Sequence, residues 1–125
     1  MASSDGRTAF ATSSDGARIA YDATGSGPVI VLLHGGGQTR RVWHDHGYVA
    51  ALSDAFTVVA VDMRGSGDSD KPTSASSYAA DRFCDDVAGV ADAIGAATFA
   101  LWGYSYGGNA VATSRRDRIG SCPSP

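Results

Sequence analysis

The chain has 125 residues, 43% of them hydrophobic, so it can form one domain with a sizeable core but not two. Its net charge of −3 is too small to favour nucleic acid or an anionic membrane as a partner. The longest purely aliphatic run, residues 29–33, is far shorter than the ~20 residues of a transmembrane helix, and the N-terminus lacks the pattern of a signal peptide.

The two cysteines do not indicate a disulfide framework. Cys84 lies within a helical pattern and Cys122 lies in a loose C-terminal segment. A reducing environment is the default expectation for such cysteines. Together with the missing signal pattern, this predicts a cytoplasmic protein.

The N-terminal part of the sequence predicts an antiparallel hairpin. After a disordered start over residues 1–6, residues 8–12 have the composition of a strand. Residues 13–16, Ser-Ser-Asp-Gly, favour a turn, and residues 18–22 alternate as a second strand does.

Three apolar runs further along the chain, at residues 29–33, 56–61 and 98–102, are typical of strands buried on both faces. Two helical patterns lie between them, an irregular one over residues 42–56 and a regular one over residues 83–94. Strands that alternate with helices predict an α/β fold, in which a mostly parallel sheet carries helices on both faces.

The second helical pattern also carries signals for its start and its end. Ser77 is a candidate N-cap, because a serine oxygen can accept a free N–H of the first turn. Asp81, Asp85 and Asp86 favour the early turns, close to the positive end of the helix dipole. Gly95 is a candidate C-cap.

The 16 glycines are concentrated where the three predicted strands end. Eight of them form three clusters, residues 35–37, Gly65 with Gly67, and Gly103 with residues 107–108. Parallel strands place their carboxyl ends at one edge of a sheet, and ligands bind beyond that edge. The clusters therefore predict a binding site there.

The segment Gly103-Tyr-Ser-Tyr-Gly107 directly follows the third of these strands. A strand that reverses into a helix within a few residues strains the central backbone, and glycines on both sides avoid the resulting collisions. This geometry exposes the Ser105 hydroxyl, while a helix that begins near Tyr106 directs free N–H groups toward it. We therefore predict Ser105 as a nucleophile, with Tyr104 beside the substrate.

The segment His34-Gly-Gly-Gly37 follows the first of the buried strands and is predicted to stabilise an oxyanion. A developing oxyanion needs two backbone N–H donors. The favoured pair is the N–H of Gly36 and the N–H of Tyr106. Gly35 and Gly37 are less favoured as donors and are predicted to contact the substrate.

Three polar residues near these loops are predicted to be structural. Asp62 and Arg64 follow the second buried strand, where they can pair with each other and fix the loop. His34 is expected to hydrogen-bond the loops, and its place before the oxyanion glycines argues against a role as general base.

The sequence gives no support to a metal or a nucleotide site. His44 and His46 are two residues apart, so they face different sides of a helix, and no third ligand cluster accompanies them. The pairs Gly25-x-Gly27 and Gly65-x-Gly67 lack the third glycine of a dinucleotide-binding loop.

In series, these motifs resemble the α/β-hydrolase family over about residues 8–109. The resemblance implies a mostly parallel sheet, a serine nucleophile, ester-like acyl substrates and no cofactor or metal. A serine in place of an aspartate nucleophile is unlike the dehalogenase and epoxide-hydrolase branches, and it points to esterases, lactonases and related hydrolases.

The sequence departs from the family pattern after Ser105. The family places an acid and then a histidine after the nucleophile, but the only later acid is Asp117 and no histidine follows His46. We therefore expect residues 7–120 to be the N-terminal part of a hydrolase domain, a truncated fold with an unstructured tail at residues 121–125. Without the histidine, the serine would be a weak nucleophile and the hydrolase weak or inactive.

Two other functions stay open. A non-catalytic fragment would bind a small acyl ligand or a partner chain through the open edge of the last apolar strand, which would also favour self-association. A nucleotide-binding domain is the third reading, and the glycine spacing disfavours it.

Overall fold

The computed structural model describes residues 6–103, and the predictions for residues 1–5 and 104–125 lie outside this range. Its elements are β1 (Ala9–Thr12), β2 (Arg18–Thr24), β3 (Val29–Leu33), α1 (Arg41–Asp45), α2 (Tyr48–Leu52), β4 (Thr57–Val61), the short 3₁₀ helix η1 (Ala75–Tyr78), α3 (Ala80–Ile94) and β5 (Ala100–Gly103).

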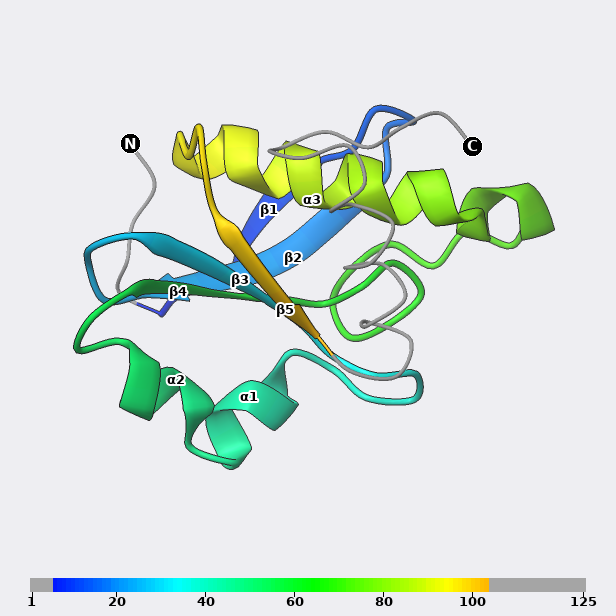
Figure 1. Ribbon diagram of the computed structural model, residues 1–125. Coiled ribbons are helices and arrows are strands. Elements are labelled where there is room, and N and C mark those ends of the chain that lie inside the picture. Colours follow the sequence, from blue (N-terminus) through cyan, green and yellow to red (C-terminus); the bar gives the residue numbers. More distant parts are fainter. Residues whose placement is uncertain (1–5, 104–125) are drawn as a thin grey trace.

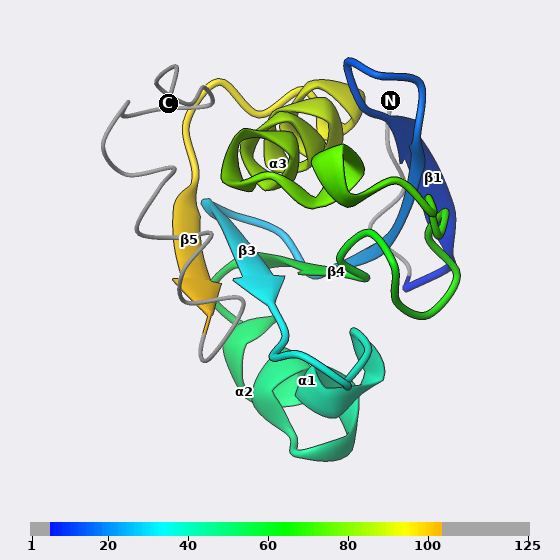
Figure 2. The same ribbon diagram turned by 90° about the vertical axis from the view of Figure 1, so that its right-hand side faces the viewer.

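The five strands form one mixed sheet in the order β1-β2-β4-β3-β5. β1 pairs with β2 and β2 with β4 in antiparallel fashion, while β3 pairs in parallel with both β4 and β5. Helix α3 covers one face of the sheet, and α1 and α2 lie against the other (Figures 1 and 2). The predicted α/β class, the N-terminal hairpin and the parallel centre are confirmed.

Each apolar strand supplies two cores because its side chains alternate between the faces of the sheet. In β3, Leu33 packs toward α3 and its neighbour Leu32 packs toward α1 and α2. In β4, Val59 and Val58 divide in the same way. This two-sided burial explains why these strands appear in the sequence as continuous apolar runs.

The helices differ in detail from their predicted ranges. The irregular pattern over residues 42–56 is two short helices, α1 and α2, separated by Gly47 at φ 80°. Ser77 lies in η1, and α3 begins after Ala79 without a side-chain cap, so the predicted N-cap was wrong. Gly95 ends α3 in the left-handed conformation at φ 74°, as predicted.

Strand β5 differs from the prediction of a strand buried on both faces. It is the last strand in the sheet order and pairs with β3. The Trp102 side chain is 42% exposed. Its place at the end of the sheet order agrees with the open edge expected for the last apolar strand, although its faces are less buried than expected.

The cysteine expectation was wrong for Cys84. This residue is buried on α3 and disulfide-bonded. No helix in the described part of the chain is long and apolar enough to cross a membrane. A cytoplasmic location stays a prediction.

Gly89 allows α3 to pack closely against the hairpin, because a side chain at this position would collide with β1. A Cβ at this position would lie 2.8 Å from the carbonyl oxygen of Thr12 in β1. We expect Gly89→Ala to destabilise the fold by about 1–2 kcal/mol, although alanine favours a helix, because overpacking outweighs propensity. Urea unfolding measures this, with the exposed Ala93→Gly as the control for propensity alone. A more stable Gly89→Ala variant would contradict the packing described here.

Candidate active site

The three parallel strands end at one level. Leu33 of β3 is aligned with Val61 of β4 on one side and with Gly103 of β5 on the other. The residues that follow these positions, beginning with His34 and Asp62, therefore emerge side by side at the carboxyl edge of the sheet. This arrangement confirms that the glycine clusters after β3 and β4 share an edge with the end of β5.

The predicted nucleophile itself lies outside the described residues, and so do Tyr104, Tyr106 and Gly107. Gly103 is the last described residue and the last residue of β5. Two loops lie beside the end of this strand at the same edge of the sheet, one after β3 and one after β4.

The glycine loop after β3 closes in a β-turn. The N–H of Gln38 donates to the carbonyl of Gly35 at 3.2 Å, and Gly37 has φ 77°. A positive φ at the third position is the mark of a type II turn. The turn therefore requires a residue such as glycine at position 37.

The hydrogen bonds of this loop separate the three candidate donors. The N–H of Gly35 donates to Oε1 of Gln38 at 3.0 Å, so it is already engaged. Gly36 and Gly37 are exposed, and their N–H groups donate to no atom of the described residues. This distribution favours Gly36 and Gly37 over Gly35 as oxyanion donors. Gln38 was not predicted from the sequence as part of the site. The signal that could have indicated it is its place directly after the glycine run, where its backbone N–H closes the turn.

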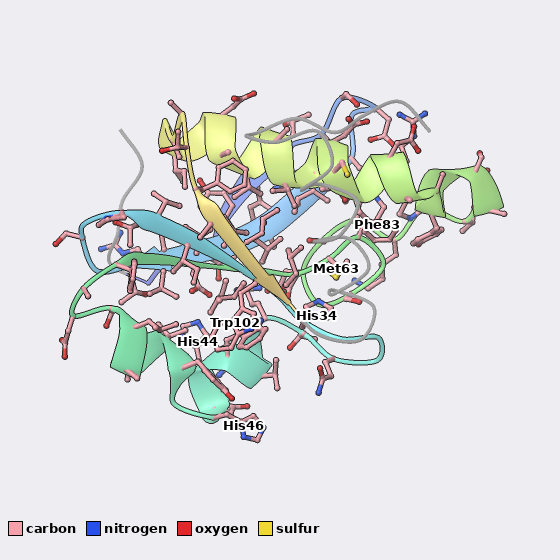
Figure 3. The ribbon with its side chains drawn as sticks, viewed as in Figure 1. His34, His44, His46, Met63, Phe83 and Trp102 are labelled. Carbon is pink, nitrogen blue, oxygen red and sulfur yellow. The ribbon has the colours of Figure 1, made fainter. Side chains whose placement is uncertain are left out.

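His34 joins the two loops at the sheet edge (Figure 3). Its Nε2 accepts the N–H of Met63 at 3.0 Å, so the proton lies on Nδ1, which donates to the carbonyl of Gly35 at 2.7 Å. Both ring nitrogens are thus engaged in the neutral tautomer. The ring is fully buried, and burial lowers the pKa of His34 below its usual value. This geometry supports a structural role for His34.

The lowered pKa of His34 predicts a pH-dependent stability. The unfolded chain takes up a proton near pH 6.5 that the folded chain resists, so this contribution is present above pH 6.5 and is lost as the pH falls. We expect the free energy of unfolding to drop between pH 7.5 and pH 5.5, and the drop to be smaller in His34→Gln. Urea unfolding at the two pH values checks this, with the exposed His46→Gln as control. An equal drop in all three proteins would contradict the assignment.

Asp62 and Arg64 do not pair with each other, so that prediction was wrong. Asp62, fully buried after β4, accepts the backbone N–H of Arg40 at 2.7 Å and forms an ion pair with its guanidinium. Arg40 also donates from Nε to Asp22 of β2 at 2.8 Å. Sequence analysis missed Arg40 because its partners are distant in the chain.

Arg64 turns instead toward α3 and the hairpin. Its Nε and Nη2 donate to Asp86 of α3 at 2.8 and 2.6 Å, and its Nη1 lies 2.9 Å from a carboxylate oxygen of Asp15. The hydrogen bond from Arg64 lowers the pKa of Asp15 to about 2. The hydrogen bonds that Arg64 donates to Asp86 raise the pKa of Arg64. Arg64 thus fixes the loop after β4, although through partners other than the predicted one.

The two histidines of α1 and its C-cap do not form a metal site. His44 is hydrogen-bonded through Nε2 to Asp22 at 2.8 Å, whereas His46 is exposed. Within residues 6–103, no three side chains are grouped as metal ligands.

A cavity of about 550 Å³ lies on the α1 and α2 side of β5. It is lined by Val42, Trp43, His46, Tyr48 and Trp102. The rings of Trp43, Tyr48 and Trp102 are in mutual contact, with centroids 5.3–5.7 Å apart. These contacts attach β5 to the two short helices close to the carboxyl end of the strand.

The sequence pattern of the family described as alpha/beta hydrolase fold matches residues 28–113. This chain belongs to the α/β-hydrolase family. The match contains both glycine loops and the Gly-x-Ser-x-Gly segment, which agrees with the shared sheet edge described above.

Similar proteins within the family include epoxide hydrolases. Epoxide hydrolase 3 of Siraitia grosvenorii is 33% identical over 93 residues, which cover 74% of this chain and 29% of that protein. The 2-(acetamidomethylene)succinate hydrolase of Mesorhizobium japonicum is 39% identical over 83 residues, 66% of this chain and 28% of that protein.

A solved structure has the same architecture. The epoxide hydrolase from an endophytic Streptomyces superimposes with a TM-score of 0.84 at 26% identity, over 94% of this chain and 36% of that one. The present chain therefore spans about a third of the length of the hydrolases that it resembles.

Proposed function

We propose that the chain carries the nucleophile and the oxyanion donors of a hydrolase that acts on acyl substrates. The supporting observation is the alignment of Leu33 with Gly103, which brings the glycine loop beside the end of β5. In this loop, the N–H groups of Gly36 and Gly37 donate to no atom of residues 6–103. Ser105 follows Gly103 by two residues, so the covalent chain limits the separation of their Cα atoms to about 7.6 Å.

In this proposal, the Ser105 hydroxyl oxygen attacks the carbonyl carbon of an ester and the negative charge develops on the carbonyl oxygen. The N–H groups of Gly36 and Tyr106 stabilise that oxygen. The alcohol leaves with the proton that the Ser105 hydroxyl gives up. Water then attacks the acyl carbon, and one of its protons returns to the Ser105 oxygen as the acid is released.

The residue type at position 105 favours an acyl substrate over an epoxide. A serine oxygen that opened an epoxide would form an ether, and an ether has no carbonyl carbon for water to attack. The enzyme would therefore stop after one turnover. A serine ester does have such a carbonyl, so the cycle can close. The epoxide hydrolases in the comparisons thus share the fold of this chain, while we assign it a different substrate class.

The rate of the chain by itself is proposed to be low. Its three histidines all precede Ser105, and both ring nitrogens of His34 are engaged. Oxyanion stabilisation without a paired histidine still gives some acceleration.

Ester turnover tests this function. We expect slow hydrolysis of p-nitrophenyl acetate above the buffer rate, and we expect Ser105→Ala to abolish it. Gly36→Pro should abolish it too, since proline fits the second position of a type II turn but lacks the N–H, and losing one oxyanion donor costs about a hundred-fold or more. Gly36→Ala is the control, because alanine also fits that position of the turn and keeps the N–H. Turnover that survives in Ser105→Ala, or styrene oxide as the better substrate, would reject the proposal.

Association through β5 is a second candidate function, supported by the exposed aromatic rings at this edge. Trp102 and Tyr48 are 42% and 41% exposed, and β5 carries no charged residue to block pairing with another strand. A partner strand would be added along β5 by main-chain hydrogen bonds.

Sedimentation velocity over a concentration series tests this association. We expect the chain to self-associate and Trp102→Lys to shift it toward the monomer. Phe10→Lys is the matched control, because Phe10 is 44% exposed on β1, the strand at the opposite edge. A wild-type chain that stays monomeric at every concentration would exclude the second copy as a partner.

A further inference from the structure

The glycine loop between His34 and Arg40 makes few hydrogen bonds of its own. Within the described residues, its internal bonds join Gly35 to His34 and to Gln38. At its end, Thr39 accepts the N–H groups of Arg41 and Val42 from the start of α1. Strand β3 fixes the beginning of the loop. The positions of the Gly36 and Gly37 N–H groups therefore depend on what holds its end, and oxyanion donors work only when they are held in place.

Arg40 holds that end with its backbone and its side chain together. Its N–H donates to Oδ1 of Asp62 at 2.7 Å, and its Nη1 pairs with Oδ2 of the same carboxylate. Both residues are buried, with Arg40 6% exposed. Because Asp62 directly follows β4, the end of the glycine loop is attached to the strand beside β3.

The Asp62 carboxylate is itself held in place by the loop after β4. Oδ2 accepts the N–H of Asp68 at 2.9 Å. A Cβ at Gly67 would lie 2.3 Å from the carboxyl carbon, so the backbone of this loop packs directly against the carboxylate. Asp62 therefore links the two glycine loops of the site.

The remaining donors of Arg40 fix the orientation of its guanidinium. Nε donates to Asp22 at 2.8 Å, and Nη2 donates to Thr8 at 2.6 Å. Nη1 also donates to Asp68 at 3.2 Å. A lysine could keep the charge but not this planar set of directed bonds. Neutralising the charge of Asp62 would need only a nearby cation, whereas these bonds also fix the direction in which the Arg40 guanidinium points.

We propose that Arg40, acting through Asp62, is the positioning residue of the glycine loop. The catalytic meaning of this inference rests on the oxyanion role proposed above for the N–H group of Gly36. Arg40 touches no substrate in this account. Arg40 keeps the type II turn of the glycine loop beside the end of β5, where Leu33 is aligned with Gly103.

Amide hydrogen exchange of the intact chain, followed by NMR, tests the positioning role directly. In Arg40→Lys we expect the amides of Gly35 and Gln38 to exchange about ten-fold faster relative to the amides of β4, as expected for the loss of a charge-assisted hydrogen bond. Arg64→Lys is the matched control, since Arg64 is equally buried and ion-paired but bonds to α3 and the hairpin. Because Arg64 also fixes the loop after β4 that holds Asp62, its exchange ratio should rise, but by less than in Arg40→Lys.

Two further measurements keep the result decisive. Asp62→Asn should give the same local increase, and it serves if Arg40→Lys does not fold. In Ser105-dependent ester turnover, Arg40→Lys should lower kcat with little change in KM. An unchanged exchange ratio in the Arg40 and Asp62 variants, or an equal rise in Arg64→Lys, would overturn the positioning role. Absence of Ser105-dependent turnover in the wild type would instead reject the proposed hydrolase function, while the exchange ratio would still decide the role of Arg40.

Discussion

The common level at which β3, β4 and β5 end is the constraint on which the site depends. Leu33 is aligned with both Val61 and Gly103, so three segments that are distant in the chain leave the sheet at one edge. A shift of register by one residue would turn the side chains of a strand to the opposite face of the sheet, and two-sided burial opposes that shift. The register that builds the two cores therefore also brings the glycine loops together.

Buried ion pairs then fix the loops that the register brings together. Arg40 and Arg64 lie near the same edge, and each is paired with carboxylates from other elements. A buried ion pair gives little net stability compared with apolar residues of the same size, because both charges lose their hydration. Their contribution here is geometric. Arg40 connects the loops after β3 and β4, whereas Arg64 connects the second loop to α3 and the hairpin.

Local patterns in the sequence were enough to predict the strands, the hairpin and the edge that carries the glycine clusters. Residues 29–33 were recognisable as a strand because every one of them is apolar. Gly95 was recognisable as a C-cap because it directly follows the helical pattern that ends at Ile94. The partners of Asp62 and Arg64 were not predictable in this way. Their nearness in sequence suggested that they pair with each other. In the fold, however, Asp62 is paired with Arg40 and Arg64 is paired with Asp86, and both partners come from other elements. The edge position of β5 agrees with the open edge expected for the last apolar strand.

The central claim is that this edge presents a reactive serine to an acyl carbonyl. Covalent labelling with an alkyl fluorophosphonate, followed by mass spectrometry of the peptides, tests it most directly, because the reagent replaces the carbonyl by a phosphoryl centre that needs the same nucleophile and donors. The account predicts one slow adduct, on Ser105, and slower labelling in Gly36→Pro. An adduct on another residue, or no adduct on the folded chain, would contradict it.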